Sequence, residues 1–259
     1  MRWAVDVVVV GKLVPDLVEE LEVDASGREL DRQFLKLVLN EFDEHALEEA
    51  ILLKEAHGAR VTVLAPEADG VDDALYTALA KGADRAVKLV GLREAPSSRQ
   101  IAAALALALP SLGFDLVLTG VQAADDLEGQ VGMLLAGYLG LPHVGVVTGV
   151  ELDPQSRRAR VRKEYPGGWL AELEVQLPAV LGIQAAKQPP RYVPVSKVRQ
   201  AMKEHTLEEL SAEPVPVPGL SVRRLSKPEA SGRAEFLDGS PEEVAAQLVS
   251  ILMERGLVR

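Results

Sequence analysis

The chain has 259 residues, of which 47% are hydrophobic and 26% are charged. This balance is typical of a folded globular protein and excludes an intrinsically disordered one. The formal net charge of −11 argues against general binding to nucleic acid or to anionic membrane surfaces. Because cysteine is absent, disulfides, thiolate metal sites and cysteine nucleophiles are excluded together.

The sequence carries no signal for insertion into a membrane. A spanning helix needs about 20 consecutive apolar residues, and no run in this chain approaches that length. The apolar block near the start is followed directly by Lys12 and then Pro15, without the cleavage pattern of a secretory leader. We therefore expect a cytoplasmic protein.

The first two thirds of the chain alternate short apolar strands with amphipathic helices. Nearly continuous apolar character over 5–10 is typical of a strand buried on both faces. Asn40 is placed to cap the first helix, which Gly58 ends. The alternation predicts an α/β fold with a parallel, doubly wound, Rossmann-like sheet of the type that binds adenine nucleotides. Its expected strands are 5–10, 60–64, 86–90 and 115–119, and its expected helices are 40–58, 72–81, 97–109 and 129–139.

From about residue 143 the pattern changes to paired strands. Turn signals at 153–156 and 166–168 separate apolar runs, which is typical of antiparallel hairpins. The sequence therefore predicts an antiparallel annex with strands 145–152, 159–164, 170–177 and 179–183. The annex and the parallel sheet together make up the expected nucleotide-binding domain, residues 1–195.

The remaining residues, 196–259, differ again. A short helix is expected over 196–203, and the proline-rich run 213–219 cannot continue it. A complete helix signal returns at Ser240, where a proline follows the cap and Glu243 completes a capping box. We interpret 196–259 as a C-terminal arm that crosses a surface, with its terminal helix docked at the far end. A loosely tethered tail is the alternative.

Ligands of open parallel sheets bind outside the carboxyl ends of the strands, where the winding direction reverses. Three segments reach this edge: the Gly11–Lys12 turn, the helix start at Asn40 and the loop 120–130. The loop leads into a helix N-terminus, whose backbone N–H groups suit a phosphate, while Asp125 or Asp126 suits ribose hydroxyls. The loop matches neither common glycine-rich phosphate motif, so a simple capped helix start is the alternative.

Five blocks of sequence, in order, resemble the β subunit of electron-transfer flavoproteins over about residues 1–205. The blocks are NEFDE at 40–44 with LEEA at 47–50, TALAKGADR at 77–85, QAADD at 122–126 with QVG at 130–132, GG at 167–168 with LPAV at 177–180, and PRY at 190–192. In that family the β subunit pairs with a larger α subunit, which holds most of a redox-active FAD. The β subunit buries AMP as a structural ligand. The resemblance therefore implies an electron-carrier subunit rather than an enzyme.

The resemblance also implies an AMP site built from four segments of this chain. Its residues would be Val10, Asn40, Glu41, Phe42, Asp43, Pro66, Val121, Gln122, Ala123, Ala124, Asp125, Asp126, Leu127, Glu128, Gly129, Gln130, Val131 and Gly132. Asn40 is the only asparagine in the chain. Its carboxamide both donates and accepts, which suits an adenine edge or a tight backbone turn. No catalytic residue and no metal ligand is implied.

Two further features of the family concern its partners. Leu17 stands where many members have a tyrosine beside the flavin ring, so the resemblance makes it FAD-proximal. Arg191, Tyr192 and Val195 match the partner-docking segment, with Val195 in place of an anchoring leucine. The resemblance implies that electrons pass from flavin dehydrogenases, such as acyl-CoA dehydrogenases, through the FAD shared with the α subunit to a membrane quinone reductase.

Two alternatives stay open. Electron-bifurcating relatives hold a second FAD in place of AMP, and this chain shares Gln130, Val131 and Gly132 with them but lacks the proline that closes their motif. A stand-alone ATP-binding domain of the stress-protein type would carry a glycine-rich phosphate loop. The loop 122–132 is acidic and contains no lysine, which argues against that type.

The other polar clusters are interpreted as structural. The four histidines lack metal-ligand spacing and are expected at the surface. The basic residues of 157–163 are expected to face Glu172 and Glu174 across a hairpin. The acidic pairs Glu48–Glu49 and Asp72–Asp73 are expected on solvated helix faces or starts.

Overall fold

The computed structural model describes residues 5–33, 35–92, 96–126, 129–153, 155–212, 217, 222–228, 234 and 236–258. The chain divides into two compact units, Met1–Arg223 and Arg224–Arg259. The expected extended run 213–219 lies outside the described residues, except for Val217.

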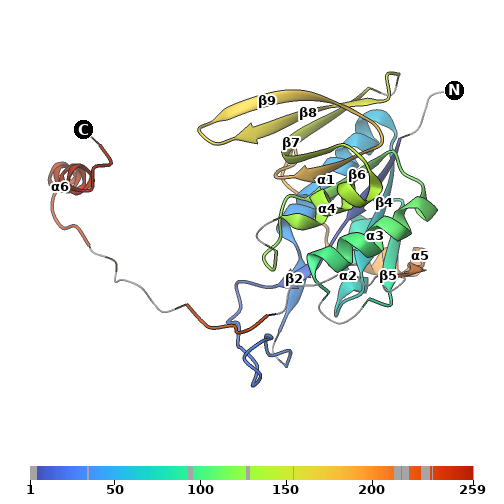
Figure 1. The fold of residues 1–259 in the computed structure, drawn as a ribbon, viewed down its shortest axis with the longest axis horizontal. Coiled ribbons are helices and arrows are strands. Elements are labelled where there is room, and N and C mark those ends of the chain that lie inside the picture. The colour runs from blue at the N-terminus through green and yellow to red at the C-terminus, as the bar shows by residue number, and fades with distance from the viewer. Residues whose placement is uncertain are drawn as a thin grey trace. The chain divides into compact units, whose positions relative to one another are not determined.

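A nine-stranded sheet forms the centre of the first unit (Figure 1). In spatial order its strands are β11 (Glu208–Ser211), β5 (Arg85–Val90), β4 (Arg60–Pro66), β1 (Asp6–Val10), β6 (Leu116–Gly120), β10 (Ala179–Ile183), β7 (His143–Asp153), β8 (Arg158–Tyr165) and β9 (Trp169–Gln176). Neighbours from β11 to β7 pair in parallel. The pairs β7–β8 and β8–β9 are antiparallel.

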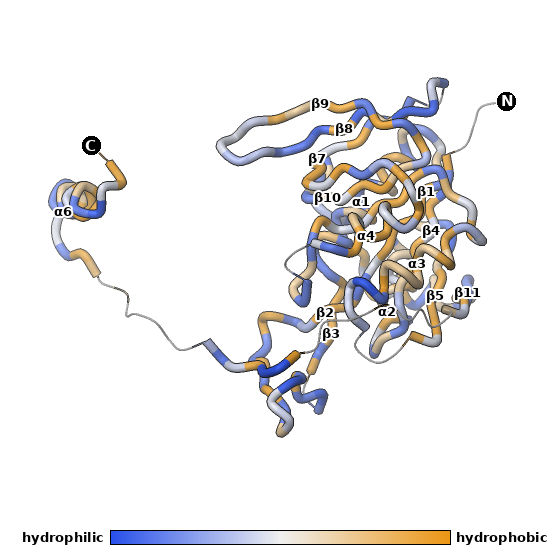
Figure 2. The backbone as a smooth tube through the Cα atoms, in the orientation of Figure 1, coloured by the Kyte–Doolittle hydropathy of each residue, from blue (hydrophilic) through white to orange (hydrophobic). Residues whose placement is uncertain are grey.

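Helices cover both faces of the parallel strands. They are α1 (Glu41–His57), α2 (Val71–Lys81), α3 (Ser98–Leu112) and α4 (Gln130–Leu139). Val7 and Val9 of β1 join the core cluster that contains residues of α1 and α2, whereas Val8 and Val10 join the cluster that contains residues of α3 and α4. Figure 2 shows the resulting concentration of hydrophobic residues in the central strands. The predicted doubly wound α/β fold is confirmed.

One expected strand of the annex belongs elsewhere. The sequence predicts 179–183 as the last antiparallel strand, and this is wrong, because β10 lies between β6 and β7 and is parallel to both. All five of its residues are buried. A fully apolar strand of this kind suits the middle of a covered sheet better than a half-exposed hairpin. The antiparallel part is therefore β7 to β9 and continues the main sheet.

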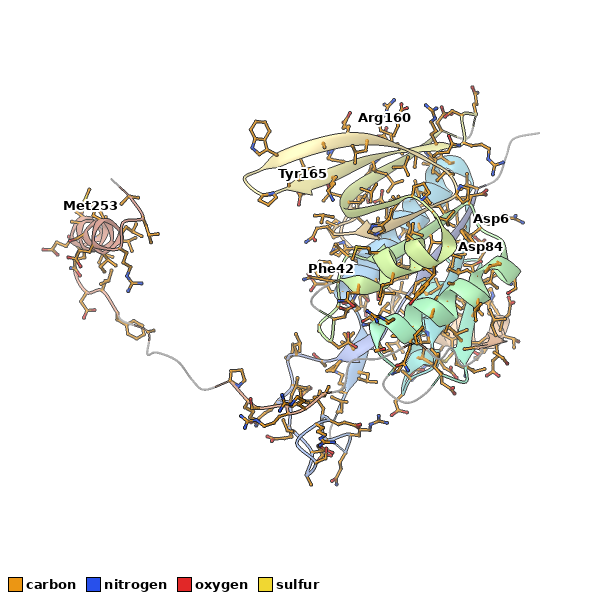
Figure 3. The ribbon with its side chains drawn as sticks, viewed as in Figure 1. Asp6, Phe42, Asp84, Arg160, Tyr165 and Met253 are labelled. Carbon is orange, nitrogen blue, oxygen red and sulfur yellow. The ribbon has the colours of Figure 1, made fainter. Side chains whose placement is uncertain are left out.

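The β8–β9 hairpin extends beyond the body of the sheet (Figure 3). Tyr165 and Trp169 pair at its turn end, where Trp169 is 75% exposed. Along its length Arg160 lies opposite Glu174 and Arg162 opposite Glu172. The expected facing of basic and acidic residues across a hairpin is confirmed.

The sequence does not predict three of the described strands in the first unit. β2 (Leu13–Pro15) and β3 (Leu37–Leu39) form a small antiparallel sheet, and β11 adds a parallel edge strand beside β5. The short helix expected over 196–203 is present as α5 (Val195–Glu204) and packs against α2. Residues 195–211 thus belong to the first unit, which ends at Arg223. The domain boundary at residue 195 stays a prediction.

The second unit contains α6 (Pro241–Glu254). Ser240 and Glu243 form the predicted capping box, with the Ser240 side chain accepting from the Glu243 backbone N–H and the Glu243 side chain accepting from the Ser240 backbone N–H. None of the residues of α6 is buried. Leu248 is 50% exposed and Met253 is 53% exposed.

Candidate functional site

A pocket opens at the carboxyl edge of the parallel strands, beside the ends of β1 and β6. β1 leads through α1 to β4 on one side and is flanked by β6 on the other, so the winding of the chain reverses at this point. The empty space, open solvent included, is about 350 Å³. The lining residues are Val10, Lys12, Asn40, Asp43, Ile101, Thr119, Gly120, Gln122, Ala123, Asp126, Gly129 and Val131.

Asp43 fixes the backbone at this edge. Its side chain is buried, and its two carboxylate oxygens accept hydrogen bonds from the backbone N–H groups of Lys12 (2.9 Å) and Gly120 (2.7 Å). Desolvation raises the pKa of the Asp43 carboxyl to about 6, although both hydrogen bonds act to lower it. Asp43 therefore ties the turn after β1 and the last residue of β6 to the first turn of α1.

Asn40 has a related role. Asn40 is the N-cap residue of α1, as the sequence predicts, but its side chain makes no cap hydrogen bond. Its Nδ2 instead donates to the carbonyl oxygen of Gln122 at 2.9 Å, and its backbone N–H donates to the carbonyl oxygen of Lys12 at 2.9 Å. The neighbouring loop supplies an acceptor that the helix pattern cannot show. Contact of Asn40 with an adenine edge stays a prediction.

Two acids shape the part of the pocket next to α4. The ammonium of Lys12 lies 2.6 Å from an oxygen of Asp125. Asp126 accepts from the hydroxyl of Ser98 at 2.7 Å and from the backbone N–H of Gln130, the first residue of α4, at 3.1 Å. Among the described lining residues Lys12 is the one cation. Asp125 therefore pairs with Lys12, and Asp126 accepts from a backbone N–H at the start of α4.

Two glycines allow α1 and α4 to approach the end of β6. A Cβ on Gly120 would lie 2.5 Å from Oδ1 of Asp43 and 2.7 Å from the Cβ of Phe42. A Cβ on Gly132 would lie 2.6 Å from Oγ1 of Thr119. Because such distances are shorter than real Cβ contacts, any larger residue would move the helix starts away from the strand.

The lining fits a nucleoside monophosphate. Val10, Ile101 and Val131 form an apolar wall suited to a base. Lys12 supplies a positive charge for a phosphate, and the first turn of α4 supplies backbone N–H groups that lack intrahelical partners. Asp126 would offer a carboxylate to ribose hydroxyls. These residues would be the contacts of AMP in this pocket.

The structure brings together part of the predicted AMP set. Eight of its residues line the pocket: Val10, Asn40, Asp43, Gln122, Ala123, Asp126, Gly129 and Val131. Eight others lie outside the lining: Glu41, Phe42, Pro66, Val121, Ala124, Asp125, Gln130 and Gly132. Leu127 and Glu128 lie outside the described residues. Contact of any of these residues with a nucleotide stays a prediction.

Four lining residues are absent from the predicted AMP set, although the sequence already places Lys12 and Gly120 in segments that reach this edge. They are Lys12, Ile101, Thr119 and Gly120. The signal for Lys12 was present, because it directly follows the first strand at the edge where ligands bind. The absence of lysine from 122–132 therefore does not leave the pocket without a cation. Ile101 lies within α3 and carries no local signal of a ligand site.

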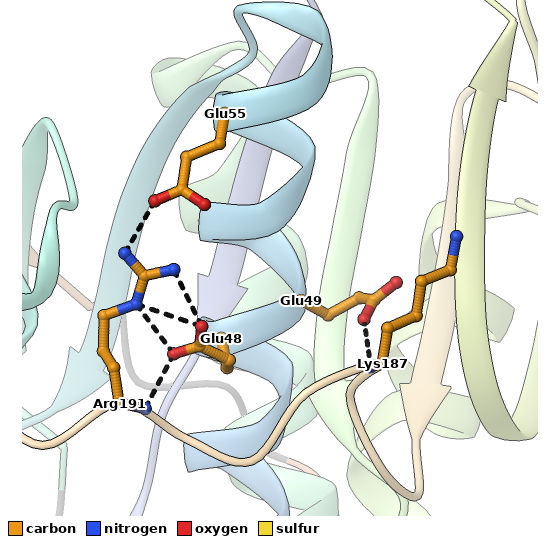
Figure 4. Close-up of polar contacts among 5 residues, drawn as sticks. All are labelled: Glu48, Glu49, Glu55, Lys187 and Arg191. Carbon is orange, nitrogen blue, oxygen red and sulfur yellow. Dashed lines mark hydrogen bonds and ion pairs between the residues drawn. The ribbon is translucent and has the colours of Figure 1, made fainter.

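The predicted partner-facing residues divide into two groups. Leu17, Tyr192 and Val195 are 67%, 86% and 63% exposed. Arg191 is engaged within the chain, 2.8 Å from Glu48 and 2.7 Å from Glu55 (Figure 4). Hydrogen bonds to these carboxylates raise the pKa of Arg191. Contact of these positions with FAD or a partner stays a prediction.

The acidic pair Glu48–Glu49 is not solvated, so that expectation is wrong. The two residues are 2% and 1% exposed. Glu49 accepts from the backbone N–H groups of Val150 (2.7 Å) and Lys187 (2.9 Å), and desolvation raises its pKa. Both donors come from segments about a hundred or more residues away, which explains why the helix pattern misplaces the pair.

The histidines His45 and His143 both lie partly buried. Nδ1 of His45 accepts from the backbone N–H of Ala186 at 3.2 Å. Burial lowers the pKa of His143, and the positive charge of Lys163 adds to this effect. No group of three or more candidate metal ligands occurs among the described residues. None of the described helices has the length and apolar character that a bilayer span requires.

Comparisons with known proteins identify the family of the chain. The family model of the electron transfer flavoprotein domain matches residues 29–215. The electron transfer flavoprotein subunit beta of Methylophilus methylotrophus is 34% identical over 96% of this chain and 98% of its own length, and that of Clostridium acetobutylicum has the same identity and coverage. The mitochondrial subunit beta of Arabidopsis thaliana is 32% identical over 80% of this chain and 84% of its own. The parallel sheet with a pocket at its reversal point fits this family. The match to the family model and the relatives that align along nearly the whole chain show that the chain belongs to the electron transfer flavoprotein family, among its β subunits.

Proposed function

We propose that the chain forms a heterodimer with an electron transfer flavoprotein α subunit, helps to enclose the FAD of that subunit and holds AMP as a structural ligand. The flavin supplies the redox chemistry when bound, whereas this chain contributes a wall, an orientation and a docking surface. The proposed electron donors are flavin dehydrogenases such as acyl-CoA dehydrogenases, and the proposed acceptor is a membrane quinone reductase. The proposed compartment is the cytoplasm.

The pocket beside β1 and β6 carries the proposal for AMP. A phosphate would compete with Asp125 for the ammonium of Lys12 and with Asp126 for the backbone N–H groups at the N-terminus of α4. Asp125 and Asp126 lie at the same end and would repel the further phosphates of ATP. A bound AMP would stabilise the fold by mass action without being consumed.

Exposed apolar residues support the proposed partner contacts. Tyr192 and Val195 project from the segment that precedes and begins α5, and Leu17 projects from the loop between β2 and β3. In α6, Leu248 and Met253 are half exposed within a unit that buries no residue of that helix. Val244, Leu248, Ile251 and Leu252 repeat at helical spacing along α6, and an apolar face of this kind favours contact with another protein. We therefore propose that the unit Arg224–Arg259 contacts the α subunit.

The test is to co-express the chain with the α subunit encoded beside it, purify the complex, denature it and quantify the released nucleotides by mass spectrometry. One AMP and one FAD per heterodimer are expected. Two FAD and no AMP would identify a bifurcating subunit and overturn the proposal for AMP. ATP or ADP together with the lack of a stable partner would contradict the proposed function as a whole.

A further inference from the structure

Side chains of α1 hold the segment 186–191 by its backbone (Figure 4). The N–H of Ala186 donates to Nδ1 of His45 at 3.2 Å. The N–H of Lys187 donates to Glu49 at 2.9 Å. The third contact comes from the N–H of Arg191, which donates to Glu48 at 2.9 Å. We call this set of contacts the α1 clasp.

Glu48 is the most heavily used member of the α1 clasp. It is 2% exposed, yet it accepts from the backbone N–H of Arg191 and from two guanidinium nitrogens of the same residue at 2.8 to 3.0 Å. A buried carboxylate is costly unless several donors satisfy it, and a bidentate guanidinium contact also fixes direction. Apolar residues at these positions would cover the sheet at a lower electrostatic cost. The acids instead specify where the segment runs.

The α1 clasp leaves the next residues projecting from a fixed backbone. Tyr192, which directly follows the last clasped residue, is 86% exposed, and Val195, four residues after Arg191, is 63% exposed. Prolines at 189, 190 and 194 restrict the backbone around them. A docking segment that is ordered before its partner arrives avoids the entropic cost of ordering on binding.

We propose that Glu48, supported by Glu49 and His45, is a positioning residue that holds 186–195 in the conformation that docks a flavin dehydrogenase. The inference rests on the proposed function, which assigns docking to Tyr192 and Val195. Glu48 acts through the backbone and guanidinium of Arg191 and does not itself touch the partner. Its contribution is to the affinity of docking and not to the flavin chemistry.

The test uses the heterodimer with Glu48→Gln, which keeps the size of the side chain but removes its charge and turns one acceptor into a donor. We expect amide hydrogen exchange to accelerate in 186–195. With an acyl-CoA dehydrogenase as electron donor, we expect KM for the heterodimer to rise about three- to tenfold, since the loosened segment must be ordered on binding. The turnover number at saturation, the flavin absorption spectrum and the nucleotide content should stay unchanged.

Glu55→Gln is the matched control. Glu55 contacts the same guanidinium at 2.7 Å, but it is 55% exposed and does not touch the backbone of the segment. An exposed ion pair contributes little, so KM should stay within about twofold of wild type and exchange in 186–195 should not change. Glu48→Ala provides a second variant in case glutamine recovers part of the contact.

Tyr192→Ala separates failure of the inference from failure of the proposed docking role. If Tyr192→Ala raises KM but neither variant of Glu48 does, despite faster exchange, docking stands and positioning by Glu48 is refuted. If none of these variants alters KM, the docking role itself fails, and the inference fails with it. Unchanged exchange in both Glu48 variants would also overturn the α1 clasp as a positioning device.

Discussion

α1 and α6 have similar capping residues and a similar apolar periodicity, but their surroundings differ. Both begin with a cap position followed by acids and both repeat apolar residues at helical spacing. α1 buries Asp43, Glu48 and Glu49, each on backbone N–H groups of distant segments. α6 buries no residue, and its apolar side chains are half exposed.

The difference shows what a helix pattern can and cannot reveal. Periodicity reports which face is apolar, but whether an acid meets water or a backbone N–H depends on segments elsewhere in the chain. In α1 the acids organise the pocket edge and the segment 186–191. In α6 the apolar side chains stay partly exposed, and we propose that the α subunit covers them. The following predictions test this contrast, beginning with the largest effect.

Removing a buried acid of α1 should have the largest effect on stability. Glu49→Ala leaves the backbone N–H groups of Val150 and Lys187 without their acceptor. We expect a loss of about 3 to 4 kcal/mol in the free energy of unfolding, measured with urea. Glu254→Ala in the exposed last turn of α6 is the control and should change it by less than about 0.5 kcal/mol. Equal losses in the two variants would remove the contrast.

The pH dependence of stability should carry the signature of Asp43. Its pKa rises from 3.8 to about 6 on folding. Between these values the folded state binds more protons than the unfolded state, so this contribution to the free energy of unfolding falls as pH rises. A shift of that size corresponds to about 3 kcal/mol.

The measurement for Asp43 is urea unfolding of wild type and Asp43→Asn from pH 4 to pH 7. Wild type should lose stability relative to the variant as pH increases, by up to about 3 kcal/mol. The variant controls for all other titrating groups, because they are the same in both proteins. Parallel stability curves would show that the carboxyl of Asp43 is not desolvated as the structure indicates.

A smaller effect is expected where α1 meets β6. Gly120→Ala places a methyl group against Asp43 and Phe42 in the first turn of α1. We expect a loss of about 2 kcal/mol in stability, because the helix start must move to admit the extra carbon. Gly137→Ala on α4, where a Cβ would meet nothing within 4 Å, is the matched control and should be neutral or stabilising. A destabilised control with an unaffected Gly120→Ala would contradict the close approach.

Deleting residues 236–259 should have the smallest effect on the first unit. Because α6 buries none of its residues, the free energy of unfolding of the sheet unit should change by less than about 0.5 kcal/mol. Association with the α subunit should weaken, which analytical ultracentrifugation of the mixed subunits would measure. Unchanged association would refute the proposed role of the arm.

Much of the fold follows from local pattern, whereas the site follows only in part. The strands and helices that flank Asn40 are visible from periodicity, and the reversal point then places Lys12 and the loop 120–130 at one edge. The position of β10 is not visible, because a short apolar run fits an antiparallel annex or a parallel centre equally well. The burial of Glu48 is not visible either, since its partner Arg191 is 143 residues away in sequence.

The most direct test of the account compares the AMP content of heterodimers containing wild type and Lys12→Met, after denaturation and mass spectrometry. The structure makes Lys12 the cation of the described pocket lining. Wild type should release one AMP and one FAD, and the variant should keep its FAD but lose AMP by about tenfold or more, as expected for a charge-assisted phosphate contact. Full retention of AMP by Lys12→Met, or its absence from wild type, would contradict the assignment of this pocket.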